Sequence, residues 1–239
     1  LLRATYIMLQ QRLGLSLPSL KKLGSWSPSD ETSLVAWYQN RVGITTVGAL
    51  LAVSEWADSS GNGYNMVQAD ATERPTYDLS SGALTFVSSS QSNIQTASQI
   101  SLTADFTLGL RIDTSTTNGA FLADNTSSNE FFKYSGASND RIALKIAGSA
   151  STNLDLDSGT FGDDHILITR VSNVITLWQN SVEQTGTTPT VTGTSLIDTI
   201  GIRRIDTNGF DGTIKEVQIY STSNVDLTAR VNLSLKDII

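Results

Sequence analysis

Apolar and polar residues alternate along much of the chain, and this two-residue period is typical of half-buried β-strands. Residues 106–112 show it most clearly, and residues 141–146 repeat it. In residues 214–220 the apolar phase slips at Lys215, which predicts a β-bulge. Ser172 and Asn173 separate two such segments and predict a two-residue hairpin loop. Further strands are predicted at residues 34–38, 74–77, 83–86, 119–124, 131–134, 165–171, 174–179 and 200–203, with a short edge strand near 154–156.

The first 13 residues have a helical period instead, because apolar side chains recur three and four positions apart. These side chains are Leu2, Tyr6, Leu9 and Leu13. Gly14 ends the helix, and a linker containing Pro18 follows it. Other apolar side chains lie off the stripe, so the helix packs either on the β domain or on another protein. The chain therefore divides into an N-terminal helical arm and linker, residues 1–30, and a β domain, residues 31–239.

Little helix is predicted between the strands. Residues 39–53 are expected to form a loop, and a short closing helix is predicted at about residues 227–235, capped by Asn224 or Asp226. About a dozen short strands separated by turns describe an all-β antiparallel sandwich of the jelly-roll kind. No internal repeat stands out, which argues against a propeller.

Composition excludes several kinds of functional site. At 239 residues the chain fits one all-β domain, and it has no cysteine, so disulfides, thiolate metal sites and cysteine nucleophiles are excluded. No run approaches the roughly 20 apolar residues of a membrane-spanning helix.

Charge is unevenly distributed along the chain. The net charge is −7, but the first 24 residues carry four cations and no acid, which leaves −11 on the rest. An acidic body argues against nucleic acid as a partner. The basic arm either docks on an acidic partner or uses its cations only to stay solvated.

An ordered series of motifs resembles the laminin-G-like, concanavalin A-like lectin/glucanase group. The loop Trp56-Ala57-Asp58-Ser59-Ser60-Gly61-Asn62-Gly63 is similar to the W-x-D-x-S-G-N-G loop of that group. Similar motifs follow in order at residues 83–86, 106–108, 165–170, 177–180 and 210–217. The chain departs from the pattern at Ser181, where glycine is usual, and at Lys215, where aspartate is usual. Residues 68–76, with Gln68-Ala69 and Arg74-Pro75-Thr76, resemble the version of this domain found in bacteriophage structural proteins.

The resemblance implies a two-sheet antiparallel jelly-roll sandwich with a short N-terminal helical arm and a short C-terminal helix. Hydrolases of this fold carry carboxylates at alternate strand positions, as in E-x-D-x-E. No such triplet occurs, and Glu216, beside the predicted bulge, is interpreted as a satisfied structural residue. His165 is the single histidine and is expected to be structural. We therefore expect a protein that is not an enzyme and needs no cofactor.

Calcium is the one ion that the sequence suggests. Asp58 and Asn62 offer hard oxygen ligands in a glycine-rich loop, and relatives bind calcium at loops of the sandwich. The alternative is that these two side chains bond the backbone of their own turn. Weaker candidates of the same type are Asp124, Asn125, Asp206 and Asn208.

A glycan-binding site would need an exposed aromatic side chain with polar neighbours. Trp178 alternates with Leu177 and Gln179, which places it on the outer face of its strand. Tyr64, Phe131 and Tyr134 are further candidates. The alternative for each is that it covers the sandwich.

The sequence thus predicts a non-enzymatic virion structural protein, either a capsid decoration or a tail-associated protein, on the exterior of the particle. The arm would bind other virion proteins through Leu2, Arg3, Tyr6, Leu9, Arg12, Leu13, Lys21 and Lys22. The alternative is a carbohydrate-binding adhesin that recognises host-surface glycans. Neither reading involves nucleic acid or a membrane span.

Overall fold

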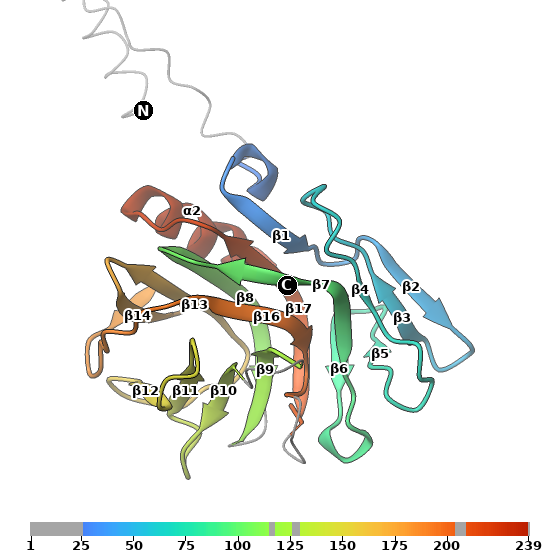
Figure 1. Cartoon of the computed structure of the whole chain (residues 1–239). Helices are drawn as coiled ribbons and strands as arrows, with labels where there is room; N and C mark the ends of the chain where they lie inside the picture. Colours follow the sequence, from blue (N-terminus) through green and yellow to red (C-terminus); the bar gives the residue numbers. More distant parts are fainter. Residues whose placement is uncertain (1–25, 115–117, 126–129, 204–208, 239) are drawn as a thin grey trace, which may run out of the picture.

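A computed structural model describes residues 26–114, 118–125, 130–203 and 209–238. It is all-β, with 17 strands and, among the described residues, one α-helix near the C-terminus, α2 (Val225–Lys236) (Figure 1). The predicted helix at residues 1–13 lies outside the described residues. Within the described ranges no helix is both long and apolar enough to cross a membrane.

The strands are short and antiparallel, as the alternating sequence predicts. They are β1 (Leu34–Tyr38), β2 (Ile44–Val47), β3 (Ala52–Trp56), β4 (Met66–Val67), β5 (Thr76–Tyr77), β6 (Leu84–Phe86), β7 (Ile94–Leu102), β8 (Phe106–Thr114), β9 (Gly119–Ala123), β10 (Phe131–Ser135), β11 (Arg141–Lys145), β12 (Thr152–Asp155), β13 (Asp164–Val171), β14 (Val174–Gln179), β15 (Val182–Gln184), β16 (Ser195–Ile200) and β17 (Gly212–Tyr220). Two short 3₁₀ helices, η1 (Pro28–Asp30) and η2 (Ser88–Ser90), complete the elements.

Hydrogen bonding arranges the strands in two runs. One run has the order β15-β14-β13-β8-β17-β1, and the other has the order β12-β11-β10-β9-β16-β7-β4-β3-β2. β5 and β6 join the runs, because β5 pairs with β3 and β6 pairs with β17. Buried side chains of both runs form a single core, to which Leu108 and Ile168 contribute from the first run and Leu122 and Phe132 from the second.

Several local predictions are confirmed. The register between β17 and β8 shifts between Ile214 and Glu216, at the predicted bulge. Ser172 and Asn173 form the tight β13–β14 turn with φ of 51° and 70°. Asn224 is the N-cap of α2, where its side chain accepts a 2.9 Å hydrogen bond from the Leu227 backbone amide.

Other boundaries differ from the prediction. Residues expected to form a loop make the β2–β3 hairpin, and β7 was not predicted. The strand expected at 200–203 instead lies at Ser195–Ile200 and is followed by Gly201, whose φ is +98°. A Cβ at Gly201 would lie 2.5 Å from the ring of Phe86, so the chain turns here where no side chain fits.

Helix α2 covers the outer face of the first run, on the side away from β9–β12 (Figure 1). Its buried face, which includes Val231 and Leu235, packs on Leu167 of β13 and Tyr220 of β17. The close approach requires Gly109 of β8, because a Cβ there would lie 2.6 Å from Val231 Cγ1. Packed in this position, α2 leaves the outer face of β14 and β15 partly uncovered.

Candidate functional site

The uncovered face forms a groove of about 1010 Å³ between α2 and strands β13 to β15. Alternation along β14 decides what faces it: Ile175 and Leu177 point into the core, whereas Thr176 and Trp178 point into the groove. Glu183 of β15 lies opposite Trp178 in the strand register and lines the groove as well. The groove therefore has a sheet as its floor and a helix as its wall.

One end of the groove combines an aromatic ring with polar side chains. Trp178 lies there with Ser181 and Glu183, facing Asn232 and Lys236 of α2. Trp178 is half-buried, and its ring packs against the apolar cluster under α2. The Trp178 Nε1 donor and the Asn232 Oδ1 acceptor are buried and have no hydrogen-bond partner among the described residues. Unpaired buried polar atoms are uncommon in native proteins, because each costs about 1–3 kcal/mol.

The rest of the groove combines apolar side chains with the polar residues Thr169, Thr176, Ser223, Asn224 and Thr228. Val171, Val225 and Leu233 line it, and 46%, 85% and 58% of their surfaces are exposed. Ala229 lies between the last two on the helix wall. Exposed apolar side chains gathered in one groove are typical of an interaction site.

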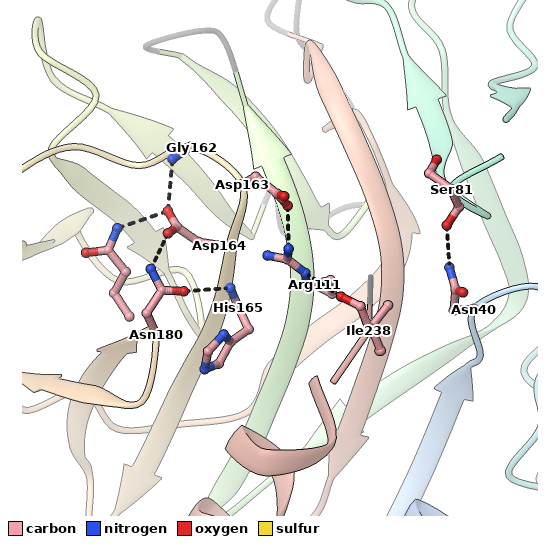
Figure 2. Close-up of polar contacts among 10 residues, drawn as sticks. Asn40, Ser81, Arg111, Gly162, Asp163, Asp164, His165, Asn180 and Ile238 are labelled. Carbon is pink, nitrogen blue, oxygen red and sulfur yellow. Dashed lines mark hydrogen bonds and ion pairs between the residues drawn. The ribbon is translucent and has the colours of Figure 1, made fainter. Parts of the chain in front are cut away.

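A network of polar contacts fixes the strand ends next to the polar end of the groove. Figure 2 shows Asp164 accepting hydrogen bonds from the Gly162 amide and the Asn180 side chain. The Asn180 Oδ1 atom in turn accepts from the His165 amide. Arg111 pairs with Asp163 at 2.9 Å and donates to the Ile238 carbonyl, which holds the C-terminus (Figure 2).

The side chain of His165 also contacts the groove lining. Its Nε2 atom lies 2.9 Å from Ser181 Oγ. Burial lowers the pKa of His165, and the nearby charge of Arg111 adds to this effect. The Asp164 carboxylate is bonded to Gly162, Gln179 and Asn180, so it fixes the hairpin backbone. The contact between His165 Nε2 and Ser181 Oγ holds Ser181 at the rim of the groove.

The four predicted glycan-binding residues lie in different environments. Tyr134 is fully buried in the core, and Phe131 is 4% exposed in a cluster with three alanines. The prediction that these two rings form exposed platforms is therefore wrong: the alanine side chains leave room that Phe131 fills. Tyr64 is partly buried against the core, and its carbonyl accepts a 2.7 Å bond from Tyr38. Trp178 is the one of the four that lines the groove.

The predicted calcium ligands are used by their own loop. The two Asp58 oxygens accept hydrogen bonds from the amides of Trp37, Ser60 and Tyr64 and from the Ser60 hydroxyl, at 2.8–3.1 Å. A carboxylate has about four lone-pair sites, so these four bonds fill them. The side-chain amide of Asn62 donates hydrogen bonds to the backbone carbonyls of Leu34 and Val35. These bonds favour the alternative interpretation, in which Asp58 and Asn62 fix the turn instead of binding calcium.

A pair of carboxyl groups comes together that the sequence did not reveal. Asp124 follows β9 and Asp198 lies in β16, which pairs with β9, so the two carboxyl groups lie close together. The Asp198 carboxylate also accepts from the Asn125 amide and the Thr199 hydroxyl, both at 2.7 Å, and Asp124 accepts from Gln99 at 2.8 Å. Burial raises the pKa of Asp198, and the charge of Asp124 raises it further.

This pair does not line an open groove. Asp124 and Asp198 are 0% and 4% exposed, and their contacts run to strand ends of the second run. The weaker calcium candidates Asp124 and Asn125 therefore belong to a buried polar cluster. Asp206 and Asn208 lie outside the described residues. Among the residues that the structure describes, no three acidic, histidine or cysteine side chains gather in a way that would hold a metal ion.

The predicted partner-binding residues of the arm, Leu2 to Lys22, also lie outside the described residues. The described chain begins at Trp26, which packs against the same apolar cluster as α2. The Trp26 indole donates to Glu31 at 3.0 Å, and Arg230 of α2 bonds the same carboxylate at 2.8 Å. The chain thus leaves the β domain beside α2.

Comparison with known proteins gives a likeness of fold. No protein-family model and no curated protein sequence matches the chain. Domain 4 of AbnA, an extracellular GH43 arabinanase from Geobacillus stearothermophilus solved with arabinotriose, is 15% identical, with 86% of this chain and 98% of that domain aligned at a TM-score of 0.51. Trypanosoma rangeli sialidase, solved as a covalent intermediate with 2,3-difluorosialic acid, is 15% identical at a TM-score of 0.54, with 93% and 36% aligned. This chain spans about a third of the sialidase, and at these identities the likeness extends to fold alone.

Proposed function

We propose that the chain is a non-catalytic recognition module that binds carbohydrate at the Trp178 end of the groove. In this proposal its fold is a laminin-G-like, concanavalin A-like jelly-roll sandwich. The observation that carries the proposal is the combination of Trp178 with Ser181, Glu183, Asn232 and Lys236 at one end of an open groove.

These residue types suit a sugar. The ring of Trp178 offers an apolar face with a polar N–H at its edge, and a sugar ring likewise has an apolar face and a polar edge. Glu183 supplies a hydrogen-bond acceptor, and Ser181 and Lys236 supply donors. Small-molecule sites are typically mostly apolar with a few placed polar groups, and this groove has that composition.

Two further observations support the proposal. The arabinanase domain that shares the fold was solved with arabinotriose, so a module of this architecture accommodates a saccharide. The carboxyl pair Asp124–Asp198 is directed to partners within the fold and is buried, whereas glycosidases flank their substrate with two accessible carboxyl groups. Recognition without hydrolysis is the function that agrees with both.

A glycan array tests the proposal with the full chain and two variants. We expect the wild type to bind a defined group of glycans and Trp178→Leu to lose at least about tenfold in affinity, which corresponds to 1.4 kcal/mol. Glu183→Gln, an exposed change, should weaken the same glycans, and a thermal unfolding curve should show that each variant is folded. Tyr64→Leu is the matched control and should leave binding unchanged. Loss of binding in Tyr64→Leu with retention in Trp178→Leu would place the site elsewhere.

A second candidate function is display on the exterior of a virion, as a capsid decoration or tail-associated protein. Two features favour it: the first 24 residues are basic whereas the rest of the chain is acidic, and residues 68–76 resemble those of phage structural proteins. In this role the arm attaches the module and the groove faces outward. Cross-linking mass spectrometry on assembled particles tests it: links from residues 1–30 to another virion protein are expected, and links confined to the chain's own β domain would contradict it.

A further inference from the structure

The groove also suits a segment of the chain itself. We propose that, before the protein meets any partner, residues 1–13 dock in the groove beside α2 through the stripe Leu2, Tyr6, Leu9 and Leu13. The inference concerns the groove as a protein-docking surface and does not depend on carbohydrate binding.

The first argument is the chemistry of the groove. Its central and α2 N-terminal parts present the apolar side chains of Val171, Val225, Ala229 and Leu233, with threonine, serine and asparagine side chains between them. An amphipathic helix buries side chains spaced by three and four residues in a groove of this kind. Residues 1–13 have that spacing. The arm and the groove would each expose apolar surface to water if they stayed apart.

The second argument is where the arm joins the β domain. The described chain begins at Trp26, packed on the α2 cluster and tied through Glu31 to Arg230. Twelve residues, 14–25, separate the predicted helix from this point, and when extended they span at most about 40 Å. Helix α2 has 12 residues and is therefore about 18 Å long. The linker is long enough to return the arm along the full length of α2.

The third argument is charge. The first 24 residues carry four cations and no acid, whereas the rest of the chain carries −11, and two of these cations, Arg3 and Arg12, lie in the docking segment itself. Of the two charged side chains that line the groove, Glu183 attracts the arm and Lys236 repels it, so the attraction comes mainly from the acidic body. A tether of this length also holds the arm at an effective concentration in the millimolar range, which favours the chain's own groove over that of a second copy.

Disulfide trapping tests the proposal in the full chain, which has no native cysteine. Ala229→Cys is combined in turn with Leu2→Cys, Tyr6→Cys, Leu9→Cys or Leu13→Cys. The matched control replaces Ala229→Cys by Ala97→Cys, which changes an alanine that is also exposed but lies on β7 of the other run. Under mild oxidation we expect at least one pair with Ala229→Cys to form an intrachain disulfide roughly tenfold or more faster than its control, as effective concentration dictates.

Each outcome decides the proposal. A fast intrachain bond, identified by peptide mass mapping of the monomer, supports docking in the chain's own groove. A bond that links two chains overturns it and assigns the groove to a second copy. Equal rates with Ala229→Cys and Ala97→Cys, or no bond with either, also overturn it. Thermal unfolding of each double variant before oxidation confirms that the β domain is intact.

Discussion

Glu216 is the buried carboxylate that joins β1 and the following loop to β17. It accepts hydrogen bonds from the Trp37 indole at 2.8 Å, the Asn40 amide at 3.1 Å and the Gln218 side chain at 2.7 Å. The sequence predicted a satisfied residue beside a bulge because this carboxylate interrupts an apolar strand. Two of its three partners lie more than 170 positions away, so no local pattern identifies them.

Asp198 gives a prediction about pH. Burial raises its pKa in the folded protein above the ordinary value of 3.8, so the folded state holds this proton more tightly than the unfolded state does. The carboxyl group therefore costs no stability below that ordinary value, and its cost grows as the pH rises through the folded-state pKa. Asp198→Asn removes the ionisation but keeps an oxygen for the Asn125 amide and the Thr199 hydroxyl. We expect the variant to gain stability relative to the wild type between pH 4 and pH 7.

Urea unfolding at both pH values measures this difference. Glu183→Gln is the control, because it neutralises an exposed carboxylate and should change stability little at either pH. If the difference in unfolding free energy between Asp198→Asn and the wild type stays constant from pH 4 to pH 7, Asp198 ionises equally in the folded and unfolded states, which contradicts the prediction. The sequence did not reveal this pair, because Asp124 and Asp198 come from strands that become neighbours only when β9 pairs with β16.

At the scale of elements, strands with strict alternation were predictable and irregular ones were not. β8 alternates strictly, with Phe106, Leu108, Leu110 and Ile112 facing the core, so its sequence shows it. β7 has three strongly apolar side chains in nine residues, and its pairing with β16 shifts register, so tertiary contacts define it more than pattern does. The groove likewise could be predicted only in part. Alternation along β14 predicts that Trp178 points outward, but the opposite wall of the groove is formed by the tertiary packing of α2.

Gly109 is the residue that lets α2 pack there, and it gives a prediction for the element. In Gly109→Val the new side chain meets Val231 and Leu235. We expect destabilisation of about 1–3 kcal/mol, the usual cost of overpacking, although valine favours strands. Amide hydrogen exchange of α2 should quicken more than that of β9 to β12. The matched change Gly162→Val adds a side chain where no atom lies within 4 Å of the Cβ position, and it should cost much less. Equal effects of both changes would show that α2 does not depend on this contact.

At the scale of the whole molecule, the point where the N-terminal residues join the β domain lies close to the groove. The chain enters the β domain beside α2, and the groove runs along the same helix. In the docking proposed above, residues 1–13 would occupy this groove before a partner binds. Removal of residues 1–25 should then raise glycan affinity.

The central claim is that the Trp178 end of the groove binds carbohydrate, and a crystal structure of the full chain with an oligosaccharide selected on the array tests it most directly. The account predicts a sugar ring packed on Trp178, with hydroxyl groups bonded to Glu183 and to Asn232 of α2. A sugar bound on the opposite run of strands, or an empty groove in crystals of a chain that binds the same sugar in solution, would contradict it.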